Sequence, residues 1–236
     1  MSKFIKSLTI DFDTEISDSE IPLFRGAILK TIGEQANLLY HNHTGSTSLR
    51  YSYPLIQYKR LGNNAAIIGI EEGADAIGQF LSESVGSLQI GQRVLNCHTN
   101  RISPSRILVQ TWSQPFYYHI SRWLPLNTKN YHIYKAIDEE NERTMFLENI
   151  LKGNLLSMLK GLGIHIESEL VLRITQLSKP YCLHNKGVGL MAFNADFTCN
   201  LSIPNHVGIG KNASIGYGII YKQKIRDKDK QISTTE

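Results

Sequence analysis

The chain has 236 residues, of which 42% are hydrophobic, so it is long enough for two small domains. Its formal net charge is +4, and this mildly basic balance suits an anionic partner. Its three cysteines, Cys97, Cys182 and Cys199, lie far apart and form no C-x-x-C pair, which argues against a disulfide framework and a zinc ribbon. The N-terminus lacks the apolar run of a signal peptide and no stretch approaches about 20 apolar residues, so we expect a cytoplasmic protein without a membrane segment.

The first half of the sequence predicts strands and helices in the order of a ferredoxin-like domain. Apolar and polar side chains alternate over residues 3–12, as in a half-buried strand, and Phe24, Ile28 and Ile32 then follow at the i, i+4 spacing of an amphipathic helix. This order places two helices on one face of an antiparallel sheet. The complete order expected here is a strand over 3–12, a helix from Pro22 to the region 35–39, strands over 51–60 and 65–70, a helix around 77–81, and strand-like segments at 94–97 and 107–111.

The second half repeats this beginning but lacks a second helix. The longest helix is expected over 143–162, where leucines recur at steps of four residues, and a glycine-rich polar stretch at 204–214 stands where the second helix would be due. We therefore predict an α+β protein of two tandem ferredoxin-like (RRM-like) domains with antiparallel sheets, over residues 1–112 and 113–236. The strands expected in this half are 116–124, 164–175, 188–197 and 217–222.

A glycine-rich segment near the C-terminus is the strongest local motif. Gly208, Gly210, Gly216 and Gly218 form two G-x-G pairs that five residues separate. Glycine permits positive φ angles and close approach of a ligand to the backbone, so successive N–H groups together with Lys211 can form a concave anion site. The spacing is neither that of a P-loop nor that of a dinucleotide fingerprint. A glycine-rich turn between two strands is the alternative.

A second motif is the segment that follows the first predicted helix. It contains two histidines in an H-x-H pair, and no acidic residue occurs from position 38 to 70. Histidine has an ordinary pKa of about 6.5, so it can act as a general base or a general acid at neutral pH. Nearby cations would stabilise the extra charge of the transition state. The site candidates are His41, His43, Tyr40 and Lys59 for catalysis, and Arg50, Arg60, Gly208, Gly210, Lys211, Gly216 and Gly218 for RNA binding.

These residues also have plainer interpretations. Histidines in a polar loop can be merely solvated, or can lie at the C-terminal end of a helix, which favours cations. Two histidines without a neighbouring Cys, Asp or Glu make a poor ligand set, so we expect no metal and no other cofactor. Strand tyrosines are most often packing residues with a solvated hydroxyl. The six other histidines are scattered, and only His206, beside the glycine-rich segment, is a candidate for testing.

The glycine pattern makes a resemblance to a known family specific. A G-h-G-x5-G-h-G loop near the C-terminus, after two ferredoxin-like halves, resembles the signature of the RAMP superfamily of CRISPR-associated proteins, and here h is Ile209 and Tyr217. The chain length, and residues 53–60 followed by 65–74, look like the endoribonuclease branch, the sixth Cas family. The resemblance covers essentially the whole chain, and it implies a catalytic histidine in the segment after the first helix.

The resemblance implies a metal-independent endoribonuclease that cuts the repeats of precursor CRISPR RNA. A 2′-hydroxyl would attack the neighbouring phosphate under general acid/base catalysis, leaving a 2′,3′-cyclic phosphate and a 5′-hydroxyl. One alternative is a non-catalytic RAMP subunit that only holds guide RNA in an effector complex, and it needs the glycine loop but not His41 and His43. Another is an unrelated protein on the same common fold. The expected partner is repeat RNA, with other CRISPR effector subunits and a homodimer as open options and no membrane.

Overall fold

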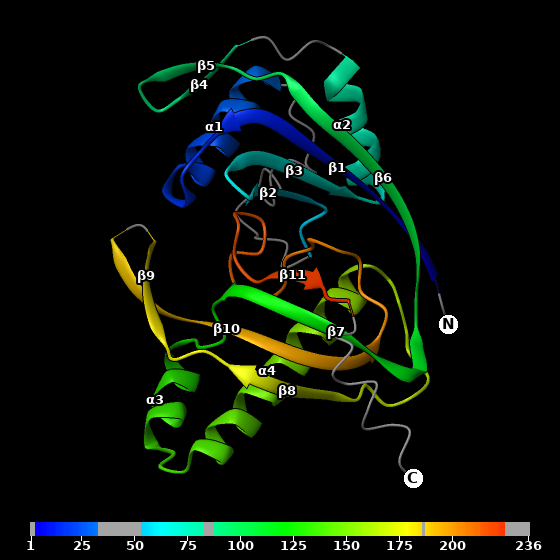
Figure 1. The fold of residues 1–236 in the computed structure, drawn as a ribbon, viewed down its shortest axis with the longest axis vertical. Helices are drawn as coiled ribbons and strands as arrows, with labels where there is room; N and C mark the ends of the chain where they lie inside the picture. Colours follow the sequence, from blue (N-terminus) through cyan, green and yellow to red (C-terminus); the bar gives the residue numbers. More distant parts are fainter. Residues whose placement is uncertain (1–2, 33–52, 83–86, 186, 225–236) are drawn as a thin grey trace, which may run out of the picture.

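The computed structural model describes residues 3–32, 53–82, 87–185 and 187–224, which form two larger antiparallel sheets that lie one above the other (Figure 1). Helices cover the outer side of each sheet, and a loop region of the second half lies between the two sheets. No helix within these ranges is both long and apolar enough to cross a membrane.

The first half contains a four-stranded antiparallel sheet in the order β2-β3-β1-β6. A short hairpin, β4 with β5, is inserted before the fourth strand. This strand order, with a helix after the first strand and another after the third, confirms the predicted ferredoxin-like arrangement. The elements are β1 (Lys3–Glu15), the 3₁₀ helix η1 (Asp18–Glu20), α1 (Ile21–Ile32), β2 (Ile56–Leu61), β3 (Asn64–Ile70), α2 (Glu72–Ser82), β4 (Ser87–Ile90), β5 (Arg93–Asn96) and β6 (Thr99–Val109).

The second half contains a sheet in the order β11-β7-β10-β8, with β9 paired to an extension of β10. The described chain forms no helix between β10 and β11, so the glycine-rich stretch replaces the second helix as the sequence predicts. The change from one sheet to the other falls between Val109 and Thr111. The elements are β7 (Thr111–Trp123), α3 (Thr128–Ala136), α4 (Glu140–Gly161), β8 (Leu172–Leu177), β9 (Tyr181–Asn185), β10 (Val188–Leu201) and β11 (Ile219–Lys222).

Side-chain alternation along β1 supplies apolar residues to two different cores. Ile10 and Phe12 lie in the core beneath α1 and α2, where the ring of Phe12 packs edge to face on that of Phe24 at 5.7 Å between centroids. Ile5, on the opposite face of the strand, belongs to the core of the second half, together with the fully buried Leu151 of α4. Because β1 contributes to both cores, the two halves pack as one unit.

The structure corrects the sequence-based assignment in several places, among them the strand expected over 51–60, which as β2 begins only at Ile56. The predicted strand over 164–175 is wrong in its first part, because β8 begins at Leu172 and Ile164 is a loop residue that packs into the core. The helix α3 and the strands β4 and β9 are not anticipated, since they are short and α3 buries only Tyr134. The fourth strand, β6, begins at Thr99, earlier than expected, because most of its side chains are exposed and carry no apolar alternation.

The glycine-rich segment between β10 and β11 joins the halves through main-chain hydrogen bonds. The Tyr58 N–H donates to the carbonyl oxygen of Ser214 over 2.8 Å, and Tyr58 forms a parallel β-bridge with Ile215. The Gly208 N–H donates to Oε1 of the buried Gln57 over 2.7 Å. Since β2 is an edge strand of its sheet, the segment covers an edge that would otherwise be free to pair.

All four glycines of this segment lie close to atoms that a Cβ would meet, and Gly218 and Gly216 have the shortest of these distances. A Cβ on Gly218, which has a φ of +59°, would lie 2.1 Å from the carbonyl oxygen of Ile209. A Cβ on Gly216, with a φ of +83°, would lie 2.5 Å from Cδ1 of Ile21 in α1. L residues rarely adopt such φ angles, so conformation and packing both require glycine here.

Replacing Gly218 by alanine should therefore destabilise the protein by on the order of 3 kcal/mol or more, because the left-handed backbone and the collision with Ile209 add up. Gly62 is a matched control, since its φ is +62° but no atom lies within 4 Å of the position that a Cβ would take there. Gly62→Ala should cost only about 1–2 kcal/mol. Denaturant unfolding of the two variants measures the difference, and equal losses would contradict the packing role of Gly218.

Candidate nucleic-acid interface at the junction of the halves

Tyr53, the first described residue after the predicted catalytic segment, lies at the junction between the halves. The hydroxyl of Tyr53 donates to the carbonyl oxygen of Gly208 over 2.9 Å and accepts from Nε2 of Gln57 over 3.0 Å. Burial raises the pKa of this phenol, so Tyr53 stays neutral and serves as an anchor. The predicted site residues that lie outside the described residues, in the segment between α1 and β2, are Tyr40, His41, His43 and Arg50.

Lys59 of β2 lies beneath the glycine-rich segment and is fully buried. Its ammonium donates to the carbonyl oxygen of Ala213 over 3.4 Å. Burial lowers the pKa of Lys59 from its ordinary value of 10.5 to about 7, because the charged form loses its hydration. A Cβ on Gly208 would lie 2.7 Å from the carbonyl oxygen of Ala213 and 2.8 Å from Nζ, so the backbone of the segment itself requires glycine beside the lysine. In this arrangement Lys59 contacts the loop and not solvent.

Arg60 and Arg122 bring one cation from each half to the carboxylate of Asp18. Nη1 of Arg122 forms an ion pair with Asp18, and Nη1 of Arg60 lies 3.9 Å from the same carboxylate. Arg122 also donates from Nε to the carbonyl oxygen of Gly216 over 3.2 Å, and its guanidinium packs 5.0 Å from the centroid of the Tyr217 ring. Arg122 thus connects Gly216 and Tyr217 of the glycine-rich segment to Asp18 in the N-terminal half of the protein.

A groove of about 1070 Å³ opens beside this ion pair, and we call it the junction groove. It is lined by residues of η1, α1, β7, β9, β10 and the glycine-rich segment, including the cationic Arg25, Arg122 and Lys211 as well as His184. Buried Nε atoms of Arg25 and Arg60 have no hydrogen-bond partner among the described residues. These two atoms are closed to a ligand and Arg60 does not line the groove, so it is the cations of the lining that suit an acceptor-rich ligand such as a phosphate.

The tip of the glycine-rich segment is its most exposed part. Gly210 and Lys211 are exposed, whereas Gly208, Gly216 and Gly218 are buried. The N–H groups of Gly208 and Gly218 donate to oxygen atoms of the protein itself. The geometry therefore leaves the tip open to a ligand and gives the buried glycines a packing role, while contact of any of them with RNA stays a prediction.

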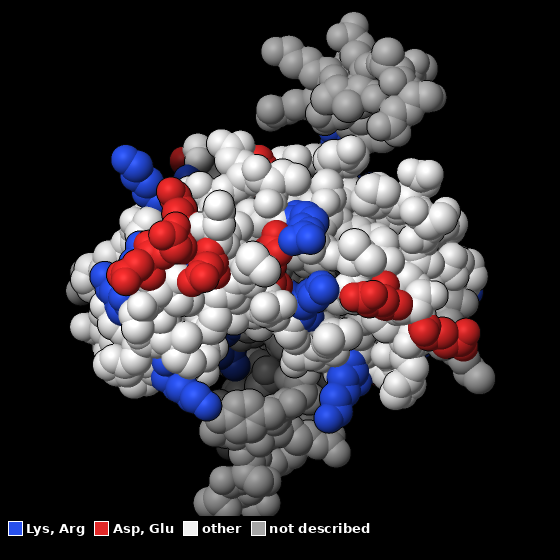
Figure 2. All heavy atoms as spheres, turned by 90° about the horizontal axis from the view of Figure 1, so that it is seen from below, with Lys and Arg blue, Asp and Glu red and all other residues white. Residues whose placement is uncertain are grey.

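Charge is unevenly distributed over the face that carries α3 and α4. Figure 2 shows a cluster of acidic side chains on the left of this view and further acidic side chains on the right, with basic side chains near its centre and around a hollow near its lower edge. Asp138, Glu139, Glu140 and Glu142 are all exposed at the beginning of α4. A polyanion would be repelled from this acidic region and attracted to the basic positions.

A row of rings lies on the second half, away from the groove lining. The ring of Tyr221 in β11 lies 5.4 Å from that of His206 and 6.2 Å from that of His119. Nδ1 of His119 lies 2.6 Å from Oδ1 of Asp196 on the neighbouring strand. Burial lowers the pKa of His206, so its ring is neutral at neutral pH. His206 therefore packs in this row and does not line the junction groove.

Sequence reasoning missed three residues of the groove, namely Arg25, Arg122 and His184. Arg25 follows the buried Phe24 in α1 and so lies off the apolar stripe, which is a weak signal for a groove residue. Arg122 adopts a φ of +53°, and no sequence pattern predicts this backbone conformation. His184 belongs to β9, a strand that the sequence did not predict. Within the described ranges, no three His, Cys, Asp or Glu side chains come together as a metal-binding group.

Replacing Lys59 by methionine should change how stability depends on pH. Between about pH 7 and 10.5 the unfolded state binds more protons at this lysine than the folded state, so the free energy of unfolding of the wild type should rise with pH in this window. Below pH 7 the burial cost is fully present. Lys59→Met removes this contribution, which amounts to at most about 1.4 kcal/mol per pH unit.

Denaturant unfolding from pH 6.5 to 9.5 measures how the free energy of unfolding changes with pH in the wild type and in Lys59→Met. Lys179→Met, at an exposed lysine, is the control. The slope of Lys59→Met should be shallower than that of the wild type, and its stability near pH 6.5 should be higher. If the free energy of unfolding depended on pH with the same slope in all three proteins, burial would not lower the pKa of Lys59.

Comparison with known proteins matches this architecture along nearly the whole chain. Models of the N-terminal and C-terminal domains of Cas6b match residues 3–107 and 110–223. An uncharacterized protein of Methanocaldococcus jannaschii is 38% identical over 106 residues, which cover 45% of this chain and 71% of that protein.

Solved structures agree with the family models. A crystal structure of Cas6b is 28% identical, with a TM-score of 0.83, and a second structure, of the CRISPR RNA processing endoribonuclease Cas6b, is 26% identical, with a TM-score of 0.73. Each alignment covers 94% of this chain and 100% of the other. A type IV Cas6 crRNA endonuclease shares the fold at 11% identity and a TM-score of 0.56. The chain therefore belongs to the Cas6b family of CRISPR RNA-processing endoribonucleases.

Proposed function

We propose that this chain cuts CRISPR repeat RNA without a metal ion, by attack of a 2′-hydroxyl on the neighbouring phosphate. The products are a 2′,3′-cyclic phosphate and a 5′-hydroxyl, and the outcome is mature CRISPR RNA. The observation that carries the proposal is the junction groove, where Arg25 of the first half faces Arg122 and Lys211 of the second. The groove lies beside α1, the helix after which the chain continues to the histidine pair.

His41 and His43 act as the general acid and base, since imidazole exchanges protons near neutral pH. Tyr40 orients the attacking hydroxyl, and Arg50 stabilises the charge that develops on the phosphate. Lys59 acts through the segment that it supports, which makes it a positioning residue for Lys211 at the tip.

The grip on the RNA is electrostatic and comes from both halves. Arg25 of the first half and Arg122 of the second line the groove and present guanidinium groups to the phosphates. Arg60, a predicted RNA-binding residue, lies outside this lining, 3.9 Å from the Asp18 carboxylate that pairs with Arg122. Lys211 adds a point charge from the exposed tip. Since the described wall of the groove contains only one carboxylate, Asp18, and Arg122 pairs with it, the net field there is positive.

Cleavage of a repeat RNA should persist in excess chelator and should stop when the nucleotide 5′ to the cut carries a 2′-deoxy sugar. The 2′-oxygen is the nucleophile in this mechanism, so its loss removes the reaction while binding remains. Replacing both His41 and His43 by alanine should lower the single-turnover rate by roughly 10²–10⁴ with nearly unchanged affinity.

His184→Ala is the matched control, because this histidine lines the groove but belongs to β9 and has no proposed part in proton transfer. Cleavage of the deoxy RNA, or a wild-type rate in the double variant, would contradict the mechanism. Tight binding of repeat RNA without any cleavage by the wild type would instead favour the non-catalytic guide-RNA subunit.

Lys211→Ala should weaken repeat binding and reduce the salt dependence of log K by roughly one phosphate contact, a change of about 0.7–0.9 in slope. The side chain is exposed, so its loss should leave the thermal melt unchanged. Affinity measured against salt, with the exposed Lys179→Ala as control, tests this directly. Parallel slopes with equal affinities would show that the tip is only a turn.

A further inference from the structure

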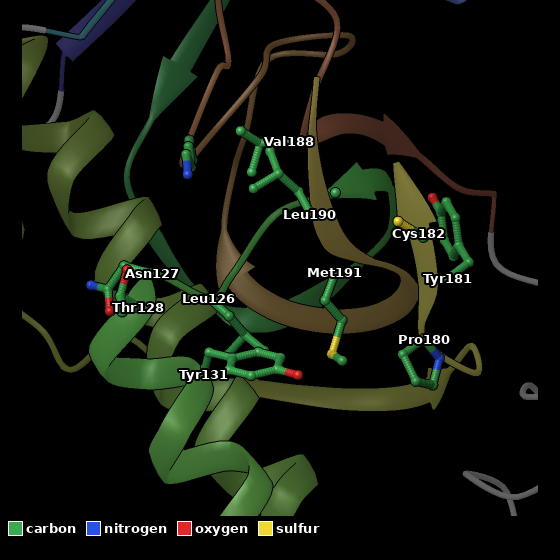
Figure 3. A pocket seen from close by; sticks show the side chains of 12 residues that line it. Leu126, Asn127, Thr128, Tyr131, Pro180, Tyr181, Cys182, Val188, Leu190 and Met191 are labelled. Carbon is green, nitrogen blue, oxygen red and sulfur yellow. The ribbon is translucent and has the colours of Figure 1, made fainter. Parts of the chain in front are cut away.

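A second cavity, of about 640 Å³, lies between α3 and the hairpin of β9 and β10 (Figure 3). Tyr131 of α3 and Met191 of β10 approach each other on one side of it, and Val188 and Leu190 lie on another. Its volume is within the range of pockets that bind small organic ligands. We call this cavity the hairpin pocket.

The lining of the hairpin pocket is mostly apolar and contains one cation. The described residues that line it include no Asp or Glu, and Lys211 is the only charged one among them. Large side chains that would ordinarily be covered are open here, since Tyr131 is 38% exposed and Val188 is 59% exposed. Lys135 lies 5.8 Å from the centroid of the Tyr131 ring, so positive charge stands near the ring as well.

The pocket adjoins the junction groove. Val188, Leu190 and Lys211 line both spaces, so a chain bound in the groove contacts residues that also line the pocket. The hydroxyl of Tyr181 donates to Oδ1 of Asn194 over 2.8 Å, which fixes the base of the hairpin wall. A ligand that joins an anionic backbone to flat apolar rings would match this combination of groove and pocket.

We propose that the hairpin pocket receives one unpaired base of the RNA that lies in the junction groove. The base packs against Tyr131 and Met191, and its phosphate lies at Lys211. Every base has a π-face, so stacking on an aromatic ring does not depend on sequence, whereas the pocket accepts only a nucleotide that is not paired. The site thereby selects for a single-stranded position at a fixed distance from the cut, and this inference rests on the proposed function.

Charge complementarity favours RNA over an apolar protein segment as the occupant. The pocket adjoins the cationic groove, and the exposed acidic residues at the beginning of α4 lie outside its lining. A protein partner would need acidic residues beside its apolar anchor, whereas RNA supplies a negative charge next to each base.

The chain carries a natural probe for this site. Cys182 is exposed and lines the pocket, whereas Cys97 and Cys199 are buried, so a thiol reagent such as DTNB should react rapidly at Cys182 alone. Repeat RNA with a 2′-deoxy sugar at the cut, which stays intact, should slow this reaction by at least roughly tenfold at concentrations well above Kd. Cys182→Ser identifies the signal, because it should abolish the rapid phase.

A series of repeat RNAs, each with one abasic nucleotide, then asks whether a base enters the pocket. One unpaired position should restore thiol reactivity while the RNA remains bound. Tyr131→Ala should weaken binding of the intact repeat but not of that abasic RNA, whereas Tyr131→Phe keeps the ring and should bind both like the wild type. The wild-type thiol measurement does not depend on how well the variants fold.

Three outcomes would overturn the inference. If RNA binds and is cut without protecting Cys182, the proposed function stands, but no part of the RNA occupies the pocket. Protection that no abasic position relieves would mean that the backbone merely covers the mouth. Protection by another effector subunit and not by RNA would make the pocket a protein-docking site. A protein that neither binds nor cuts repeat RNA would instead defeat the proposed function itself, and with it this inference.

Discussion

The structure depends on the insertion of one glycine-rich segment of the second half against an edge strand of the first. Tyr58 and Gln57 of β2 bind its main chain directly, and Tyr53, just before β2, binds it through its hydroxyl. The segment is packed so closely that a Cβ on Gly218 would lie 2.1 Å from the carbonyl oxygen of Ile209. Because these contacts are made by main-chain groups at short range, a displacement of the segment would break several of them together, which couples the halves.

The same insertion places charge where an RNA needs it. Lys59 is buried beneath the segment, while Lys211 is carried on its exposed tip toward the junction groove. Arg122 ties the segment to Asp18 of the first half and contributes to the groove wall at the same time. Packing and RNA binding therefore share the same few residues, and the glycine motif serves the fold at its buried positions and the proposed ligand at its tip.

Much of this fold follows from the sequence, because both halves begin with a strand of regular alternation and a strongly periodic helix. The missing second helix was also predictable, since the glycines from Gly208 to Gly218 cannot support one. The loop around Ile164 was not, because buried loop residues and strand residues look alike in sequence. The groove depends on contacts between distant positions, such as Arg122 with Asp18, and no local pattern reports them.

The chemistry of the cut ends tests the central claim most directly. Mass spectrometry of a repeat RNA cleaved by the purified wild-type protein should find a 2′,3′-cyclic phosphate on the upstream fragment and a 5′-hydroxyl on the downstream one, since an attacking 2′-oxygen can leave no other immediate products. Water attack at the same phosphate, as in two-metal nucleases, would leave a 3′-hydroxyl and a 5′-phosphate. Those ends would contradict the account.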